Sequence, residues 1–317
     1  MNNTILSIIG NTPLVRLTTM FRPDLHVYAK LELLNPGGSA KDRPAMRIIS
    51  EAWREGKIGP GSVVVESSSG NMAISMASIC ARYGLRFICV IDPKTSASNV
   101  QILKSFGAEI SRVEEPDADT GEFLPARLTR VQELLAAIPN SYWPNQYGNE
   151  NNYLAHYEGT MKEIVQQLGS VDYVFGAVST CGTMHGCAAY VRDHRLSTKL
   201  IAVDAVGSVI FGGKKEFRRF PGIGAGIVPP FAQTRFMDRI VKVSDRDMVI
   251  GCRRLVAEES ILAGPSSGAV AMALARIEQE LPGGAVCVVI VHDRGERYLD
   301  TVYCDEWVEQ QFGELPS

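Results

Sequence analysis

The sequence predicts a two-domain α/β protein whose parallel-rich sheets are covered by helices on both faces. Between residues 24 and 204, short apolar runs rich in Val and Ile alternate with longer amphipathic stretches, with Gly or Ser at the joins. Near-continuous apolar strands separated by helices are typical of parallel sheets, because both faces of such strands are buried. The length of 317 residues exceeds what one hydrophobic core usually serves, which favours two domains.

The expected strands are apolar runs that end at polar or glycine residues, at 26–33, 62–66, 86–91, 109–113, 173–178, 200–204 and 285–291. The expected helices are amphipathic and follow most of these strands, at 41–55, 71–83, 97–106, 125–137, 153–167, 182–194 and 267–280. Ligands of parallel sheets bind beyond the carboxyl ends of the strands, so we expect the site in the loops that leave them. Residues 214–230 lack clear periodicity and are a candidate lid.

The composition argues against several classes of function. The formal net charge is −3, which leaves no excess of Lys and Arg for a nucleic acid backbone or an anionic membrane. The first residues lack a basic region before an apolar stretch and no run is long enough to span a bilayer, so we expect a cytoplasmic protein without a membrane partner. The seven cysteines and five histidines show no metal-ligand or disulfide spacing, so no metal site is expected.

The segment Asn-Pro-Gly-Gly-Ser-Ala-Lys, residues 35–41, places Lys41 after a glycine pair at the expected start of a helix. The positive end of a helix disfavours a cation, so the amine of Lys41 is shifted toward its neutral, nucleophilic form. A solvated lysine on an exposed helix is the alternative. The Gly-Gly-Ser-x-Lys pattern alone does not decide between the two interpretations.

The segment Glu-Ser-Ser-Ser-Gly-Asn, residues 66–71, leaves an expected strand and opens an expected helix. Its hydroxyl and backbone N–H groups suit a carboxylate bound at the positive end of that helix. Serine also caps helices, but three hydroxyls with Gly and Asn exceed what capping requires. Both interpretations stay open on these residues alone.

Two later loops repeat this arrangement. Residues 178–183, Val-Ser-Thr-Cys-Gly-Thr, can donate several N–H groups to a phosphate, although an ordinary strand-to-helix turn is the alternative. They lack the lysine of a Walker loop and the three glycines of a dinucleotide site. Residues 263–269, Ala-Gly-Pro-Ser-Ser-Gly-Ala, either cap a helix or point into a cleft. The charged stretch 293–298 is interpreted as a surface turn without a chemical role.

Taken in this order, these motifs resemble those of fold-type II pyridoxal phosphate (PLP) enzymes, the cysteine synthase family. The opening Ile-Gly-Asn-Thr-Pro-Leu-Val-Arg-Leu, residues 9–17, is also similar, and the resemblance runs essentially end to end. It implies a larger PLP-binding domain of residues 1–44 and 151–317, a smaller mobile substrate domain of residues 45–150, and the cofactor in the cleft between them. It also implies a homodimer.

The resemblance further assigns roles to single residues. Lys41 would bind the cofactor aldehyde and Asn71 would face the 3′-oxygen of its ring. The cofactor phosphate would be held by Ser179, Thr180, Cys181, Gly182 and Thr183. The substrate carboxylate would be received by Ser68, Ser69, Gly70 and Gln146. Ser266 would sit at the pyridine nitrogen, and because its side chain is neutral, we expect that nitrogen to be largely unprotonated and the ring to be a weak electron sink.

Within the family, several segments are more similar to the transferases that make N-(2-amino-2-carboxyethyl)-L-glutamate, a precursor of 2,3-diaminopropionate for siderophores or antibiotics, than to cysteine synthase; these are residues 113–118, 131–135, 145–147, 203–212 and 293–300. This resemblance implies β-replacement on O-phospho-L-serine with L-glutamate as the second substrate. Arg127 would meet the substrate phosphate, because a guanidinium binds a dianion through two hydrogen bonds. Tyr147 would line the second-substrate side.

Three residues depart from the family pattern: Met72 replaces a usual Thr, Ala73 replaces a Gly, and Cys181 stands where Gly or Thr is usual. We expect Cys181 to be a packing variation, since backbone N–H donation does not need its side chain. The alternative function is an O-acetylserine or O-phosphoserine sulfhydrylase, which shares the first half-reaction. A serine dehydratase is less favoured, and a catalytically idle protein of the same fold is opposed by the joint presence of Lys41, Asn71 and Ser266.

Overall fold

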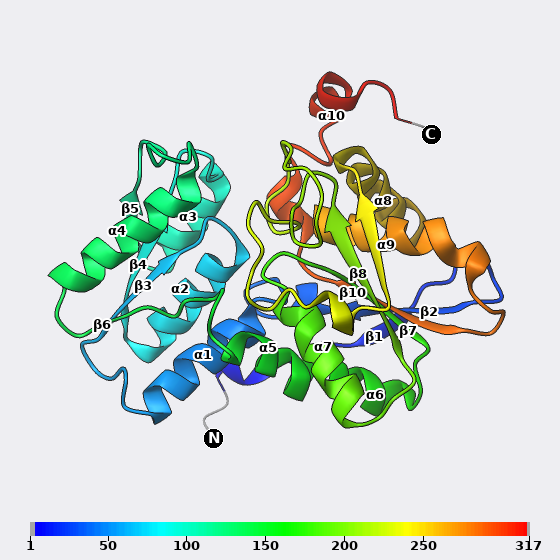
Figure 1. Cartoon of the computed structure of the whole chain (residues 1–317), viewed down its shortest axis with the longest axis horizontal. Helices are drawn as coiled ribbons and strands as arrows, with labels where there is room; N and C mark the ends of the chain where they lie inside the picture. The colour runs from blue at the N-terminus through cyan, green and yellow to red at the C-terminus, as the bar shows by residue number, and fades with distance from the viewer. Residues whose placement is uncertain (1–3, 316–317) are drawn as a thin grey trace. The chain divides into compact units, whose positions relative to one another are not determined.

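The computed structural model describes residues 4–315, which form two compact units (Figure 1). The first unit contains the N-terminal segment up to Ile9 together with Lys41–Asn152, and the second contains Gly10–Ala40 and the chain from Tyr153 onward. These divisions lie within a few residues of the expected domain boundaries after residues 44 and 150, except that the N-terminal segment groups with the smaller unit. The cofactor and substrate roles assigned to the two domains stay predictions.

The first unit is built on a four-stranded parallel sheet with the order β5-β4-β3-β6. Its strands are β3 (Val63–Ser67), β4 (Arg86–Ile91), β5 (Glu109–Arg112) and β6 (Ser141–Tyr142). Its helices are α1 (Asp42–Arg54), α2 (Asn71–Tyr83), α3 (Ala97–Ser105), α4 (Phe123–Ala137) and the start of α5 (Asn151–Ala155), with a 3₁₀ turn at Ile5–Ile8.

Alternate residues of these strands enter two different cores, as expected for a sheet covered on both faces. Val64 and Phe87 pack with residues of α1 and α2 on one face. Val65 and Val90 pack against Val131 of α4 on the other. Packing on both faces therefore fixes the orientation of these strands, and their carboxyl ends lie at one edge of the sheet.

The second unit contains a six-stranded sheet with the order β1-β2-β10-β7-β8-β9, in which β1 is antiparallel to β2 and the other pairs are parallel. The strands are β1 (Leu14–Arg16), β2 (His26–Leu31), β7 (Tyr173–Ala177), β8 (Lys199–Ala205), β9 (Arg239–Val243) and β10 (Val286–Val291). The helices are the π-helix His156–Met161, α6 (Lys162–Leu168), α7 (Gly182–Asp193), α8 (Asp245–Glu259), α9 (Pro265–Ile277) and α10 (Asp305–Phe312), with 3₁₀ turns at Glu32–Leu34, Thr234–Phe236, Glu278–Glu280 and Gly295–Tyr298.

Helices cover both faces of this sheet as well. Helices α8 and α9 share a core with Phe175 and Val289 on one face. Helices α6 and α7 share a core with Val174 and Val288 on the other face, and Figure 1 shows the two helix layers on opposite sides of β7 and β10. The predicted α/β class with parallel-rich, doubly covered sheets is confirmed. No helix within residues 4–315 is both long and apolar enough to cross a bilayer.

The seven expected strands are all present, with ends that differ by at most two residues, and the expected helices are present too. Five elements were not expected: β1, β6, β9, α8 and α10. The helix expected over 153–167 is interrupted by the π-helix, where one extra residue enters the turn. The candidate lid, residues 214–230, contains no helix or strand.

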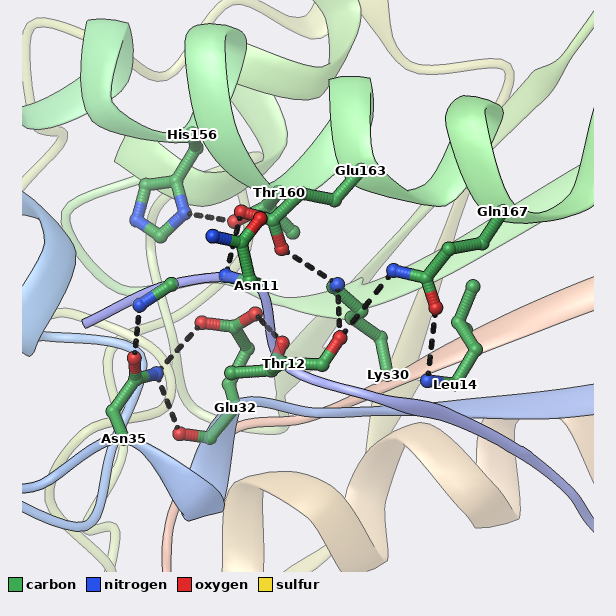
Figure 2. A network of polar contacts seen from close by, with 11 residues as sticks. Asn11, Thr12, Leu14, Lys30, Glu32, Asn35, His156, Thr160, Glu163 and Gln167 are labelled. Carbon is green, nitrogen blue, oxygen red and sulfur yellow. Dashed lines mark hydrogen bonds and ion pairs between the residues drawn. The ribbon is translucent and has the colours of Figure 1, made fainter. Parts of the chain in front are cut away.

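A buried polar network joins β1, β2 and α6 within the second unit (Figure 2). The ammonium of Lys30, which is fully buried, lies 2.7 Å from the Glu163 carboxylate and donates to the Thr12 carbonyl at 2.6 Å. Thr12 in turn donates to Glu32, which also accepts from the Asn35 amide. Removing one partner would leave a buried charge unpaired, which is strongly destabilising. The network therefore holds in place the segment that leads into the Gly-Gly-Ser-x-Lys motif.

Candidate active site

Three of the four predicted carboxylate-binding residues lie in the first unit on the loop between β3 and α2, which we call the β3–α2 loop (Ser68–Gly70). Gly70 is the N-cap of α2 and, as a glycine, has no side chain with which to cap that helix end. The first N–H groups of a helix have no partner within the helix, so this end favours an anion. The Ser68 carbonyl accepts from the Cys89 thiol at 3.1 Å and the Ser69 carbonyl accepts from the Asn99 amide at 3.0 Å, which fixes the loop backbone.

A buried carboxylate lies behind this loop. Glu66 is 1% exposed and accepts from its neighbour's backbone, Ser67 N–H at 2.8 Å, and from the Trp143 indole at 3.3 Å. Burial raises the pKa of Glu66 to about 7, although these hydrogen bonds and the charge of Arg127 act in the opposite direction. Glu66 opens the Glu-Ser-Ser-Ser-Gly-Asn motif, but the motif alone does not predict this support for the loop.

Gln146 joins the β3–α2 loop from a distant part of the sequence. Its backbone N–H donates to Glu66 at 3.3 Å and its side-chain amide donates to the Ser67 carbonyl at 3.4 Å. Asn152 holds the other side of this residue by donating to the Gln146 carbonyl at 2.6 Å. The structure therefore brings Gln146 beside the loop, and its role toward a substrate carboxylate stays a prediction. Tyr147, the next residue, is half-buried.

Arg127 of α4 is a nearly buried cation in the same unit, with a side chain that is 13% exposed. Its Nε lies 3.4 Å from the carboxylate of Asp92, which directly follows β4, yet no described residue gives this buried nitrogen a hydrogen-bond partner. Strands β3 and β4 are neighbours in a parallel sheet, so Asp92 and the β3–α2 loop follow the same edge. The guanidinium therefore has hydrogen-bonding capacity near that edge that Asp92 does not use.

Lys41 is the N-cap of α1 and is half-buried. The predicted position at the start of a helix is confirmed. The next residue, Asp42, is buried and accepts from the Ser75 hydroxyl of α2, which ties the first turn of α1 to its neighbour.

The predicted phosphate-binding residues lie in the second unit, on the loop between β7 and α7, which we call the β7–α7 loop (Val178–Cys181). Cys181 is the N-cap of α7, with φ +66° and no side-chain capping bond. Gly182 and Thr183 begin the helix, so their N–H groups belong to its positive end. The Ser179 hydroxyl donates to the Gly224 carbonyl at 3.2 Å, and Gly224 N–H donates to the Val178 carbonyl at 2.7 Å.

A buried histidine lies behind the β7–α7 loop. His156 belongs to the π-helix and is fully buried, with Nε2 3.3 Å from the Thr183 hydroxyl and Nδ1 2.9 Å from the Thr160 hydroxyl. π-helical turns inside α-helices often occur at functional sites. The histidine spacing in the sequence gave no indication of this contact, because the two residues meet only through packing of the π-helix against α7.

Ser266 lies in the first turn of α9, and a second carboxylate stands beside it. The Ser266 hydroxyl donates to Oδ1 of Asp293 at 3.4 Å, and the Tyr298 hydroxyl donates to Oδ2 at 2.8 Å. The preceding residue, His292, accepts from Ala177 N–H through Nε2 at 2.9 Å. His292 and Asp293 follow β10 directly, so the interpretation of 293–298 as a turn without a chemical role missed two buried contacts beside predicted cofactor residues.

The residues of the second unit fit PLP in their chemistry. A phosphate dianion needs several N–H and hydroxyl donors at a positive helix end, and the β7–α7 loop with Thr183 supplies both. A pyridine nitrogen needs one hydrogen-bonding hydroxyl, which Ser266 supplies. Gly264 leaves room for this arrangement, because a Cβ there would come within 2.2 Å of Asp293 Oδ1.

Comparison with known proteins agrees with this chemistry. Residues 5–293 match the family described as pyridoxal-phosphate dependent enzyme. Three solved structures are similar over nearly their whole length. An O-acetylserine dependent cystathionine beta-synthase from Helicobacter pylori is 32% identical, with a TM-score of 0.88, 96% of this chain covered and 99% of that chain. An O-ureido-L-serine synthase is 29% identical, with a TM-score of 0.90 and coverage of 100% and 98%.

The third structure is a hydrogen sulfide-producing enzyme from Fusobacterium nucleatum, which is 32% identical with a TM-score of 0.87 and coverage of 94% and 98%. A match over most of the chain, together with relatives above 30% identity, establishes the family and its cofactor. The chain therefore belongs to the pyridoxal-phosphate dependent enzymes, in the fold-type II group that includes the cysteine synthase-like and cystathionine β-synthase-like proteins.

Proposed function

We propose that this protein is a transferase that joins O-phospho-L-serine and L-glutamate to give N-(2-amino-2-carboxyethyl)-L-glutamate and phosphate. It would thus be an N-(2-amino-2-carboxyethyl)-L-glutamate synthase, acting in 2,3-diaminopropionate biosynthesis. The observation that carries the choice of substrate is the nearly buried guanidinium of Arg127 with an unused Nε, in the unit that also holds the β3–α2 loop. The segments that surround Arg127 and Tyr147 resemble those of the transferases that make this product, which supports the same choice.

This proposal gives the predicted site residues the following roles. Lys41 binds the cofactor aldehyde and then moves the Cα proton of the serine substrate. Bound PLP withdraws electrons from that Cα, which loosens its proton and the group on the β-carbon. Asn71 meets the 3′-oxygen of the cofactor, and the β3–α2 loop with Gln146 binds the substrate carboxylate. Thr183 and the β7–α7 loop bind the cofactor phosphate.

Arg127 favours a phosphate over an acetate as the leaving group because of charge. A phosphate monoester is close to a dianion at neutral pH and accepts two hydrogen bonds from one guanidinium, whereas an acetate ester is neutral. The buried Nε–H of Arg127 has no hydrogen-bond partner among the described residues, and burial makes such a donor costly to leave unpaired. A phosphate dianion would supply acceptors for these donors.

The alternative is a sulfhydrylase that uses O-acetylserine or O-phosphoserine with sulfide. One similar structure is named for O-acetylserine, which supports the first substrate of this alternative. The two activities share the first substrate position and differ in the nucleophile. The residues described above bind the serine part, so the second substrate has to be decided by experiment.

Product analysis by mass spectrometry separates these functions. The PLP-loaded protein is incubated with O-phospho-L-serine and either L-glutamate or sulfide, and phosphate release is measured in parallel. We expect the glutamate adduct with an equal amount of phosphate. Formation of cysteine from sulfide, without any adduct from glutamate, would contradict the proposal and favour the sulfhydrylase.

Arg127→Met tests the role of the guanidinium. We expect kcat/KM for O-phospho-L-serine to fall about 100-fold, because losing a charge-assisted contact to a dianion costs about 3 kcal/mol, while O-acetyl-L-serine turnover changes little. Arg130→Met is the matched control, since Arg130 lies on the same helix and pairs with Glu133 at the surface. Equal losses for both substrates would mean that Arg127 has only a structural role.

A further inference from the structure

Several buried polar groups of the first unit lack a hydrogen-bond partner among the residues that the structure describes, and three of them can donate. They are the hydroxyl of Ser67 at the end of β3, the hydroxyl of Thr95 before α3, and Nε of Arg127. Ser67 is 3% exposed and Thr95 is 7% exposed. Leaving a buried donor unpaired is costly, so such groups indicate an acceptor that binds beside them.

Ser67 and Arg127 lie on the same face of the four-stranded sheet. Val65 of β3 shares a core with Val131 of α4. Side chains alternate along a strand, so Ser67, two residues after Val65, points to the same side. Arg127 lies one turn before Val131, on the helix face that covers the sheet. Both side chains therefore face the space between the sheet and α4.

Asp92 fixes the guanidinium at the carboxyl edge of this face. It directly follows β4, two residues after Val90, which is the β4 partner of Ser67. Its Oδ2 lies 3.4 Å from Arg127 Nε, and its Oδ1 accepts from Lys94 N–H at 2.9 Å, which holds the carboxylate in place. A guanidinium paired with a carboxylate attracts an anion less than a free one does, so neutral donors must add to the binding of an anion here.

Thr95 reaches the same edge through the turn that follows β4. Its N–H donates to the Asp92 carbonyl at 3.1 Å, which closes the turn. Within the turn, the ammonium of Lys94 lies 5.4 Å from the centre of the Phe123 ring in the first turn of α4. The turn therefore packs against the helix that carries Arg127, and Thr95 is placed beside the Asp92–Arg127 pair.

This edge also borders the loop that we expect to bind the substrate carboxylate. Ser67 directly precedes the β3–α2 loop. The Asn99 amide, in the helix that follows the Thr95 turn, donates to the Ser69 carbonyl at 3.0 Å. The three unpaired donors and the β3–α2 loop thus belong to one connected edge of the first unit.

We propose that the Ser67 and Thr95 hydroxyls bind the phosphate group of O-phospho-L-serine together with Arg127, and that they thereby determine which leaving group the enzyme accepts. This rests on the proposed function, from which it takes the serine substrate and the role of Arg127. A phosphate monoester has three terminal oxygens that accept hydrogen bonds, so it can engage a guanidinium and two hydroxyls at once. An acetate ester is neutral and has a single carbonyl oxygen, so it cannot use all these donors.

Ser67→Ala and Thr95→Val each remove one hydroxyl with little change in shape. The measurement is single-turnover release of phosphate from O-phospho-L-serine, and of acetate from O-acetyl-L-serine, by the PLP-loaded protein without a second substrate. We expect the second-order rate constant for O-phospho-L-serine to fall about 10-fold in each variant, because a hydrogen bond to a charged group is lost. The constant for O-acetyl-L-serine should change little. Equal changes for both substrates, or no change for either, would overturn the inference.

Thermal unfolding without ligands separates a ligand-binding hydroxyl from a structural one. Since neither hydroxyl has a partner among the described residues, Ser67→Ala and Thr95→Val should leave the unfolding midpoint unchanged or raise it. Ser62→Ala is the matched control, because Ser62 is buried directly before the same strand but its hydroxyl accepts from Gly59 N–H at 2.9 Å and donates to Asn140 at 3.1 Å. It should lower the midpoint and keep the substrate preference. Midpoints lowered as far in the other two variants would show structural hydroxyls and would overturn the inference.

The second substrate takes no part in this test, so the two proposals can fail separately. If the protein made cysteine from O-phospho-L-serine and sulfide, the proposed function would fail and the phosphate contacts would stand. If the wild-type protein joined O-phospho-L-serine and L-glutamate while both variants kept its preference for phosphate over acetate, the contacts of Ser67 and Thr95 alone would be refuted. If the wild-type protein released no phosphate from O-phospho-L-serine, both would be refuted.

Discussion

The β3–α2 loop of the first unit and the β7–α7 loop of the second have similar local structure, but the buried side chain behind each loop is different. Each leaves a buried parallel strand and ends at a helix whose N-cap residue makes no side-chain capping bond. Behind the first loop lies an acid, Glu66, with a pKa raised to about 7 by burial. Behind the second lies an imidazole, His156, hydrogen bonded to Thr183 and Thr160.

This difference affects the pH dependence of the two loops, because Glu66 changes between a neutral and a negative form near neutral pH. Glu66 contacts Gln146 and Ser67, so its charge is felt by the groups that we expect to receive a carboxylate. A negative Glu66 opposes a second carboxylate, and a neutral Glu66 does not. The contacts of the β7–α7 loop described here involve hydroxyl and backbone groups, which suit permanent retention of a phosphate.

An aspartate introduced into each loop in turn tests which of the two binds the cofactor phosphate. Thr183→Asp puts a carboxylate where the cofactor phosphate is expected, and repulsion of several kcal/mol should weaken PLP binding at least about 100-fold. Ser69→Asp puts the same charge in the β3–α2 loop and should leave PLP binding near normal while raising the KM for the amino acid substrate. PLP titration by absorbance and steady-state kinetics measure the two effects.

The two variants can be compared directly because both introduce the same negative charge. Loss of PLP binding in both variants would show that the β3–α2 loop also serves the cofactor phosphate. Loss in neither would remove the phosphate assignment of Thr183. Circular dichroism spectra of both variants establish that the change is local.

Glu66→Gln tests whether the carboxylate behind the β3–α2 loop makes the stability of the protein depend on pH. The folded-state pKa of Glu66 is raised from 4.5 to about 7, so Glu66 binds a proton more tightly in the folded chain than in the unfolded chain. Its favourable contribution is therefore complete below about pH 4.5 and is lost as the pH rises through about 7. Between these limits the wild-type protein should lose up to about 3 kcal/mol of unfolding free energy relative to Glu66→Gln.

Urea unfolding of both proteins at intervals from pH 4.5 to 8 measures this difference. Glu109→Gln is the control, because Glu109 is exposed and its pKa is lowered by its hydrogen bond to Arg86, so its titration lies below this range. A constant difference between wild type and Glu66→Gln at all pH values would show that Glu66 does not titrate near 7. The same variant should also flatten any rise in substrate KM between pH 6 and 8.

The sequence predicted the sheets and the loops more fully than it predicted what supports the loops. Strands β4 and β10 have apolar runs of five and six residues, while β1 and β6 have three and two residues and carry no periodicity of their own. Glu66 stood within a recognised motif, but its burial depends on Trp143 and Gln146, which lie 77 and 80 positions away. Such supports are long-range contacts, so no local pattern reports them.

Substitutions of Cys181, at the end of the β7–α7 loop, test how much the backbone conformation there changes the unfolding free energy. Cys181 has φ +66°, a conformation that costs a side-chain-bearing residue about 1–2 kcal/mol and glycine almost nothing. Cys181→Gly relieves that strain but gives the unfolded chain more freedom, so the two terms nearly cancel and the unfolding free energy should change by less than about 1 kcal/mol. Cys181→Val should be clearly destabilising, since a β-branched residue fits this conformation poorly.

Gly70, the matching N-cap of the β3–α2 loop, provides the contrast. Its φ is −135° and an added Cβ would meet nothing within 4 Å, so Gly70→Ala should be tolerated in the absence of ligands. Thermal unfolding of the three variants without PLP measures these terms apart from cofactor binding. A large loss of stability in Cys181→Gly would mean that the thiol, whose sulfur lies 3.9 Å from the Ser179 carbonyl, stabilises the loop, and Cys181 would then be more than a packing variation.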